Sequence, residues 1–307
     1  MSKIFISIVI ISFTAAFALG QNFSKADDLH DRGLKLYEEG SYDAAIESFS
    51  RSIEYSSSLD QKSSLKRSSL VSEDQSRIMA VEPRAAIAYM NRGNVYFAKN
   101  DMEHAIGDYD RAIRILPGMT EAYVCRGSAR MIQRDLAGAI ADYEKAMKLD
   151  PQYIKAYIGR ALALLDKGDA QAALEDFGKA LKIAPKDAEA YFRRGDVYRT
   201  QQTWELARSD YETAIKLDPK MAGAYMGRGV LHYRDGNYAD AVNDYTTAIK
   251  LDGRIAQFYT FRGYAFLAMN KDEDAERDFA RAIAIAPRYR ANIDENRTAI
   301  LKSRKAK

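Results

Sequence analysis

The chain has 307 residues, of which 47% are hydrophobic and 29% charged, and its formal net charge is +3. These values are ordinary for a water-soluble protein, and so small a positive charge argues against a protein built to bind nucleic acid. The single cysteine, Cys125, cannot form a disulfide within the chain, so packing alone must hold the fold together.

The first residues have the pattern of a secretory signal peptide. Lys3 gives a positive start, residues 4–19 are an uncharged apolar run, and small residues stand at the third and first positions before a cut after Gly20. We therefore predict that residues 1–20 are a signal peptide, cleaved near Gly20/Gln21, and that the protein is exported, either periplasmic or secreted. The alternative is an uncleaved anchor, although this apolar run is shorter than the roughly 20 residues of a spanning helix.

Glycines recur at intervals of 34 residues along most of the chain. The spacing is held by Gly93, Gly127, Gly195, Gly229 and Gly263, with Ala161 filling the one gap. When this glycine is counted as position 8, the chain divides into six contiguous units and one earlier unit that is out of phase. The units cover residues 26–59, 86–119, 120–153, 154–187, 188–221, 222–255 and 256–289.

Four further positions carry the same type of residue in most units. Position 4 is tyrosine in six units, position 20 is alanine in all seven, position 24 is aromatic in all seven, and position 32 is proline in five. Small residues at positions 8 and 20 allow two helices to approach closely, and the aromatic side chains fill the volume around that contact. Proline ends the second helix. Each unit is therefore predicted to be helix, turn, helix and stop.

The 34-residue period and these residues closely resemble the tetratricopeptide-repeat (TPR) family. The resemblance implies an all-α fold: a right-handed α-solenoid of seven TPR helix-turn-helix units with a C-terminal capping helix. It also implies a non-catalytic scaffold for protein–protein interaction, which binds a peptide or partner protein in the concave groove of the superhelix.

Charged residues also keep the register of the repeat. Position 7 is arginine in all seven units, and position 23 is aspartate in six, with Ser48 in the first unit. We predict a ladder of arginine–aspartate ion pairs that ties the helices of one unit, or adjacent units, together. An anion-binding row of arginines is the alternative, but partners that repeat in step with the fold favour a structural role.

Residues 60–85 are a serine-rich insertion between the first two units. Nine of the 21 residues from Ser56 to Ser76 are serine, and the others include several charged residues. Such a composition buries little apolar surface, and we expect a mobile loop. The loop is either a modification or docking segment, or a tolerated surface insertion.

Residues 290–307 leave the repeat pattern and are predicted to form the capping helix, with Ile293, Ile300 and Leu301 covering the last unit. From Arg288 onward there are seven basic and two acidic residues, a local charge of +5. This basic tail either contacts an anionic surface such as lipid headgroups or only complements the dipole of its helix.

The TPR resemblance places positions 5 and 9 of the first helices in the concave groove. Apolar side chains at position 5 of five consecutive units suit an extended peptide or an amphipathic helix. The alternative is that these residues pack against the neighbouring unit. The predicted groove residues are Met90, Asn94, Val124, Ser128, Ile158, Phe192, Asp196, Met226 and Tyr264.

No catalytic motif stands out from the repeat. The three histidines lie in different units without metal-ligand spacing, and Cys125 reads as a small core residue. We therefore predict no enzyme, no cofactor, no metal site and no nucleic-acid partner. The alternative function is a membrane-tethered assembly factor, which would use an uncleaved N-terminal anchor and the basic tail.

Overall fold

The computed structural model describes residues 25–66 and 73–305, with side chains for residues 25–56 and 84–304. The described residues form fifteen α-helices and one short 3-10 turn, and they contain no strand. The helices are α1 (Lys25–Glu38), α2 (Tyr42–Lys66), α3 (Glu73–Ala98), α4 (Met102–Ile115), α5 (Thr120–Ile132), α6 (Leu136–Leu149), α7 (Ile154–Lys167), α8 (Ala170–Ile183), α9 (Ala188–Thr200), α10 (Trp204–Leu217), α11 (Ala222–Arg234), α12 (Tyr238–Leu251), α13 (Ala256–Ala268), α14 (Asp272–Ile285) and α15 (Arg290–Lys305).

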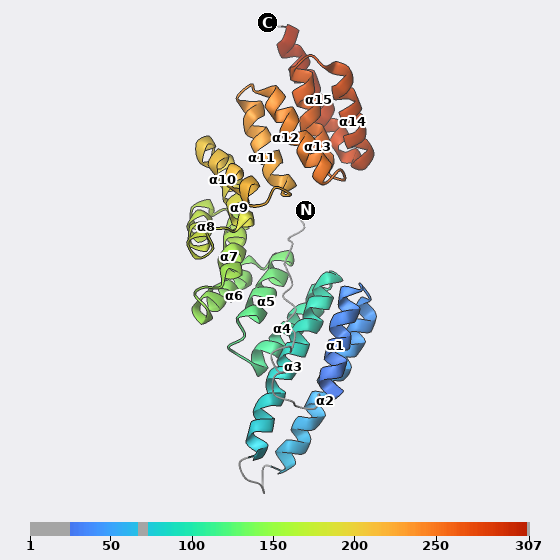
Figure 1. The fold of residues 1–307 in the computed structure, drawn as a ribbon, viewed down its shortest axis with the longest axis vertical. Helices are drawn as coiled ribbons and strands as arrows, with labels where there is room; N and C mark the ends of the chain where they lie inside the picture. The colour runs from blue at the N-terminus through green and yellow to red at the C-terminus, as the bar shows by residue number, and fades with distance from the viewer. Residues whose placement is uncertain (1–24, 67–72, 306–307) are drawn as a thin grey trace. The chain divides into compact units, whose positions relative to one another are not determined.

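The chain divides into two compact bodies (Figure 1). The first body extends to Asp169 and contains α1 to α7, and the second begins at Ala170 and contains α8 to α15. Within each body, consecutive helices pack as pairs, and each pair packs on the next. The architecture is the all-α solenoid of helix pairs that the sequence predicts.

In the six units whose two helices belong to one body, the core lies between the small residues of positions 8 and 20 and the aromatic ring of position 24. All seven alanines of position 20 have no exposed surface, and the seven aromatic residues of position 24 are at most 2% exposed. A Cβ atom added at Gly263 would lie 2.5 Å from the ring of Phe279. This confirms the predicted packing, because any larger residue at that glycine would push the paired helices apart.

The two helices of each unit are joined by a turn that needs one left-handed residue. Position 15 has a positive φ in every unit; the seven residues are Gly40, Asn100, Arg134, Gly168, Gln202, Gly236 and Asn270. At Gln202 the turn is closed by two hydrogen bonds, from its own amide to Arg199 O and from Thr203 N to Tyr198 O. This pattern ends a helix by satisfying its last carbonyl groups.

The serine-rich insertion differs from the expected loop. Helix α2 continues to Lys66 and α3 begins at Glu73, so most of residues 60–85 are helical; residues 67–72 lie outside the described residues. Figure 1 shows α2 and α3 as long antiparallel neighbours. The physical reason is that a helix already nucleated in a repeat is extended at little cost, and serine is only a moderately poor helix former.

Helix α15 covers the end of the second body, as predicted. Ile293 is 1% exposed and packs with Phe279 and Leu267, and Ile300 and Leu301 pack at the edge of the same cluster. Arg297 stands 34 residues after Gly263, where every unit has glycine or alanine, and its guanidinium pairs with Glu276 at 2.6 Å. The capping helix therefore lacks the small residue that receives a second helix.

Candidate functional site

The arginines of position 7 and the aspartates of position 23 form bidentate ion pairs within a unit. Both oxygens of the carboxylate accept hydrogen bonds from Nε and Nη2 of the arginine, at 2.5–2.9 Å. The pairs are Arg92–Asp108, Arg126–Asp142, Arg194–Asp210, Arg228–Asp244 and Arg262–Asp278. The predicted ladder is therefore present in five units.

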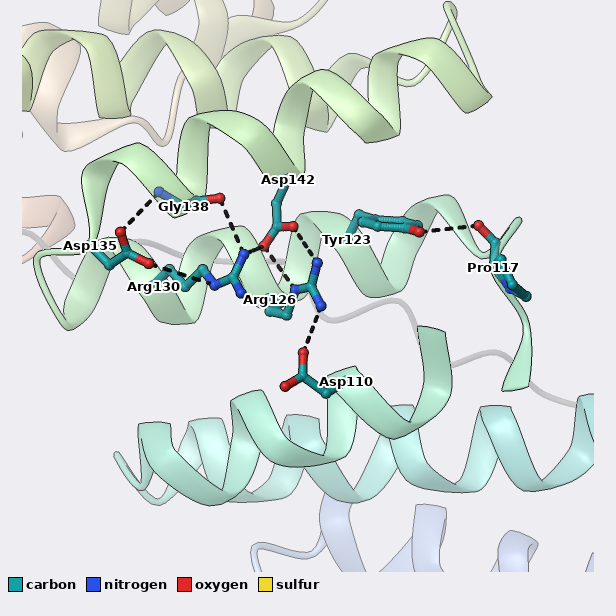
Figure 2. A network of polar contacts seen from close by, with 8 residues as sticks. All are labelled: Asp110, Pro117, Tyr123, Arg126, Arg130, Asp135, Gly138 and Asp142. Carbon is teal, nitrogen blue, oxygen red and sulfur yellow. Dashed lines mark hydrogen bonds and ion pairs between the residues drawn. The ribbon is translucent and has the colours of Figure 1, made fainter. Parts of the chain in front are cut away.

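The third guanidinium nitrogen of these arginines reaches the preceding unit. Figure 2 shows Arg126 between Asp142 of its own unit and Asp110 of the unit before, with Nη1 at 2.6 Å from Asp110 Oδ1. Position 25 of the preceding unit supplies the acceptor in four units: Ser50 to Arg92 at 2.8 Å, Asp110 to Arg126, Glu144 to Arg160 at 3.2 Å, and Thr246 to Arg262 at 3.1 Å. The arginines thus tie helices both within and between units.

Aromatic rings enclose the same guanidinium groups. The Cζ atom of Arg194 lies 5.5 Å from the ring centroid of Tyr191 and 5.7 Å from that of Tyr198. The hydrogen bonds to Asp210 raise the pKa of Arg194, although desolvation acts in the opposite direction. Guanidinium groups held by a carboxylate and by one or two aromatic rings have few donors left for a ligand, which favours a structural role over anion binding.

The side chain at position 9 of a unit is hydrogen-bonded to the hydroxyl of the tyrosine at position 24 of the same unit. Tyr109 donates to Asn94 Oδ1 at 2.8 Å, and Tyr211 donates to Asp196 Oδ1 at 2.8 Å. The same contact joins Tyr143 and Ser128 at 3.0 Å. In units with phenylalanine at position 24, position 9 holds Leu34, Leu162 or Tyr264. Sequence analysis assigned Asn94, Ser128 and Asp196 to a groove and missed this pairing, which is visible in the sequence as a correlation between the two positions.

The nine predicted groove residues do not share one environment. Met90 is fully buried, and Asn94, Val124, Ser128 and Tyr264 are 3–8% exposed. The four that remain half-buried are Ile158, Phe192, Asp196 and Met226. Five of the nine are therefore buried in this structure and four keep exposed surface, and their assignment to a groove stays a prediction. Neighbouring helices cover these five positions, and Tyr264 contacts α15, where its hydroxyl donates to Asn292.

Six half-buried side chains lie on two neighbouring first helices of the second body, and we call this set the first-helix face: Phe192, Asp196 and Arg199 of α9, and Met226, Val230 and Tyr233 of α11. The ring of Phe192 lies against Gly223, where an added Cβ would be 2.7 Å away. Arg199 pairs with Asp196 at 3.4 Å and donates from Nε to the Tyr211 hydroxyl at 3.1 Å. The face thus combines an apolar row with one charged pair. Sequence analysis overlooked Arg199, which replaces the apolar residue of position 12 in other units.

The described residues offer little for metal or covalent chemistry. No group of three histidine, cysteine or acidic side chains is arranged to hold a metal ion within residues 25–56 and 84–304. Cys125 is 6% exposed, and burial raises the pKa of its thiol to about 12, which keeps it protonated. Among the helices that the structure describes, none is long and apolar enough to cross a membrane; residues 1–20, predicted to be the signal peptide, lie outside them.

The basic C-terminal segment is partly neutralised by its own body. Arg297 pairs with Glu276, and Arg304 pairs with Asp272 and donates to Leu267 O at 2.9 Å. These arginines fix α15 to α13 and α14. Their charge is therefore reduced as seen from an approaching anionic surface.

Family comparisons match the repeats directly. Models described as tetratricopeptide repeat match residues 158–222, 192–245 and 226–290, and also residues 86–119, and a model described as TPR repeat matches residues 127–168. A comparison with curated proteins finds no match.

Solved structures share the fold at low sequence identity. A tetratricopeptide repeat protein from Parabacteroides merdae is 18% identical, with 90% of this chain and 98% of that chain covered and a TM-score of 0.62. Pseudomonas aeruginosa pilF is 16% identical, with 67% and 94% covered and a TM-score of 0.61. PilW, described as a type IV pilus biogenesis factor, is 16% identical, with 66% and 94% covered and a TM-score of 0.60. With its repeats matched from residue 86 to residue 290, this chain belongs to the tetratricopeptide-repeat family.

Proposed function

We propose that this chain is a non-catalytic interaction scaffold that binds a peptide, or an extended segment of a partner protein, on the first-helix face of its second body. One observation carries the proposal: Phe192, Met226 and Val230 keep partly exposed apolar surface on neighbouring first helices, whereas Met90 and Val124 in the first body are buried. Apolar side chains gathered on an accessible face are a feature of interaction surfaces.

An extended peptide suits this face better than a small molecule. The apolar row passes from α9 to α11, so a ligand must be long enough to touch successive helices. The Asp196–Arg199 pair beside the row offers polar groups to a main chain, and side chains of the ligand can rest on the apolar residues.

Peptide selection tests the proposal. A library of random peptides is selected on the full-length chain, and the affinity of the selected peptides is measured by fluorescence anisotropy. Met226→Glu puts a charge into the apolar row and is expected to weaken binding at least about tenfold, which corresponds to about 1.4 kcal/mol. Leu206→Glu is the control, because Leu206 is 52% exposed on the second helix α10 and should tolerate the same change. Equal affinity of Met226→Glu and wild type for every selected peptide would refute the proposed face.

We also propose that the chain works after export, on the basis of the signal-like pattern of residues 1–20. N-terminal sequencing of the native protein tests this: a chain that begins at Gln21 supports export with cleavage. A retained N-terminus would favour the membrane-tethered assembly factor instead. That alternative has less support from the tail, because Arg297 and Arg304 are held in ion pairs.

A further inference from the structure

The sixth unit, residues 222–255 and called unit 6 when the seven units are counted from the N-terminus, lacks the hydrogen bond between positions 24 and 9. Position 24 is Tyr245, but position 9 is Val230, which has no acceptor for the hydroxyl. Tyr245 has no exposed surface, and its hydroxyl has no hydrogen-bond partner among the described residues. In the other three units with a tyrosine here, the hydroxyl is paired. A buried polar group without a partner is costly, so the exception calls for a physical explanation.

The register of the repeat shows where this hydroxyl points. Tyr211 contacts Asp196 and Arg199, which are positions 9 and 12 of its unit, and Tyr143 likewise contacts Ser128 and Met131. The equivalent residues of unit 6 are Val230 and Tyr233. Both belong to the first-helix face, so the Tyr245 hydroxyl lies directly beneath it.

The side chains packed around the Tyr245 ring are mostly apolar, and Arg199 is near enough to act on its hydroxyl electrostatically. Met226, Val230, Tyr233 and Phe261 are half-buried side chains packed on the cluster that contains Tyr245. The ring centroids of Tyr245 and Phe261 are 6.0 Å apart. Burial raises the pKa of Tyr245, so its hydroxyl keeps its proton and acts as a donor at neutral pH.

We propose that unit 6 contains a subsite for the main chain of an extended peptide, in which the Tyr245 hydroxyl donates a hydrogen bond to a carbonyl oxygen of that peptide. An apolar side chain of the same peptide lies on Met226, Tyr233 and Phe261. The peptide thus supplies the acceptor that Asn94 supplies to Tyr109 in unit 2. This inference rests on the proposed function, because it assigns a ligand group to a residue beneath the same face.

Reaching the hydroxyl requires a local movement. Val230 and Tyr233 stand between Tyr245 and solvent, and Tyr233 is half-buried on the surface. In this proposal the Tyr233 side chain leaves its contact with Tyr238 by a change of rotamer when the peptide binds. A carbonyl oxygen fits the need, because it accepts a hydrogen bond and brings no charge into a buried site.

Two substitutions separate a ligand subsite from a mere packing defect. The probe is a peptide selected on the wild-type chain whose binding is lost in Met226→Glu. Tyr245→Phe removes the donor, and Val230→Asn supplies an internal acceptor. Each is expected to weaken the peptide's affinity about fivefold to tenfold, the effect of one hydrogen bond. Val230→Asn is also expected to raise the melting temperature, since it completes the pair seen in unit 2.

The matched control is Tyr109→Phe in unit 2, which removes a hydroxyl that Asn94 already satisfies. It should lower the melting temperature and leave peptide affinity unchanged. If Val230→Asn stabilises the chain and binds the probe as tightly as wild type does, the subsite is refuted while the first-helix face stands. If Tyr245→Phe binds like wild type, the hydroxyl has no part in recognition. If no selected peptide is sensitive to Met226→Glu, the proposed function itself fails, and the subsite with it.

Discussion

Arg194 connects the two helices of unit 5 through a carboxylate that water hardly reaches. The side chain of Asp210 is 6% exposed, and that of Arg194 is 22% exposed. Removing one member of such a pair leaves the other charge buried without compensation. Arg193, the preceding residue, pairs instead with Glu189, whose side chain is 47% exposed. Loss of the Arg194 pair is therefore expected to lower the free energy of unfolding far more than loss of the neighbouring Arg193 pair.

We expect Arg194→Leu to lower the free energy of unfolding by about 3 kcal/mol, because it leaves Asp210 charged and unpaired in the core. Arg193→Leu is the control and should cost less than about 1 kcal/mol, as exposed ion pairs do. Thermal and urea unfolding of the two variants measure the difference. Equal stability of the two variants would mean that the ladder contributes nothing to the fold.

His30 is a second residue whose environment sets a measurable property. It is 2% exposed, its Nε2 accepts a hydrogen bond from Asn91 Nδ2 at 3.1 Å, and burial lowers its pKa from 6.5 to about 4. The neutral ring is the form that accepts from Asn91. Protonation would cost both this bond and the desolvation of a charge.

The lowered pKa of His30 predicts the sign of a pH effect. Between pH 6.5 and about 4 the unfolded chain binds a proton at His30 that the folded chain does not, so stability falls as the pH falls through this window. The full loss is about 3 kcal/mol. His30→Leu should reduce the slope of melting temperature against pH in this range. An unchanged slope would show that His30 titrates normally in the folded protein.

In the turn between paired helices, the residue type does not always suit the backbone conformation. Position 15 is left-handed in all seven units, yet it holds glycine in three of them and a residue with a side chain in four. A side chain in this conformation costs roughly 1 kcal/mol or more. Glycine or asparagine stands at position 15 in five units and indicates a left-handed residue, but Arg134 and Gln202 in the other two units obscure the pattern.

We expect Gln202→Gly to stabilise the chain by about 0.5–1 kcal/mol, because φ at Gln202 is 59° and glycine adopts this angle without strain. The reciprocal control is Gly236→Ala at the same position of unit 6, where φ is 80°, and it should destabilise by a similar amount. Chemical denaturation measures both. A destabilising effect of Gln202→Gly would show that its side chain makes a contact that outweighs the backbone strain.

The sequence predicts a structural feature well when the contacts that produce this feature lie within one repeat unit, and poorly when they involve neighbouring units. The arginine–aspartate pairs span 16 residues of one unit and were predicted, as was the packing of Gly263 against the aromatic ring of position 24. Burial of Met90 and Val124 depends on neighbouring helices, which composition does not reveal. The insertion is helical because its flanking helices extend into it, a cooperative effect that a count of serines misses.

At the scale of the molecule, stability is shared among neighbouring helix pairs, and the ends of an array have only one neighbour. Ile293 contributes the buried contact that compensates at the C-terminal end, since it fills the space beside Phe279 and Leu267. The same helix receives a second anchor from the Arg304–Asp272 pair. The end of the second body is thus closed by apolar contacts around Ile293 and by the ion pairs of Arg297 and Arg304.

Ile293→Ala is expected to cost about 3 kcal/mol at this end, because it leaves a cavity beside Phe279. Amide hydrogen exchange should show the loss of protection concentrated in α13, α14 and α15, as expected when neighbouring units unfold locally. Ala299→Ser, on the exposed side of α15, is the control. Protection that falls equally in α9 and α10 would mean that the second body unfolds as one cooperative block.

Arg297 also makes α15 unlike the first helix of a repeat unit. In six units position 8 is glycine, and a Cβ added there would lie 2.5–3.0 Å from the aromatic ring of the second helix; α15 has Arg297 at this position. A second helix packed on α15 as in the units would therefore meet a long charged side chain where glycine leaves room in the units.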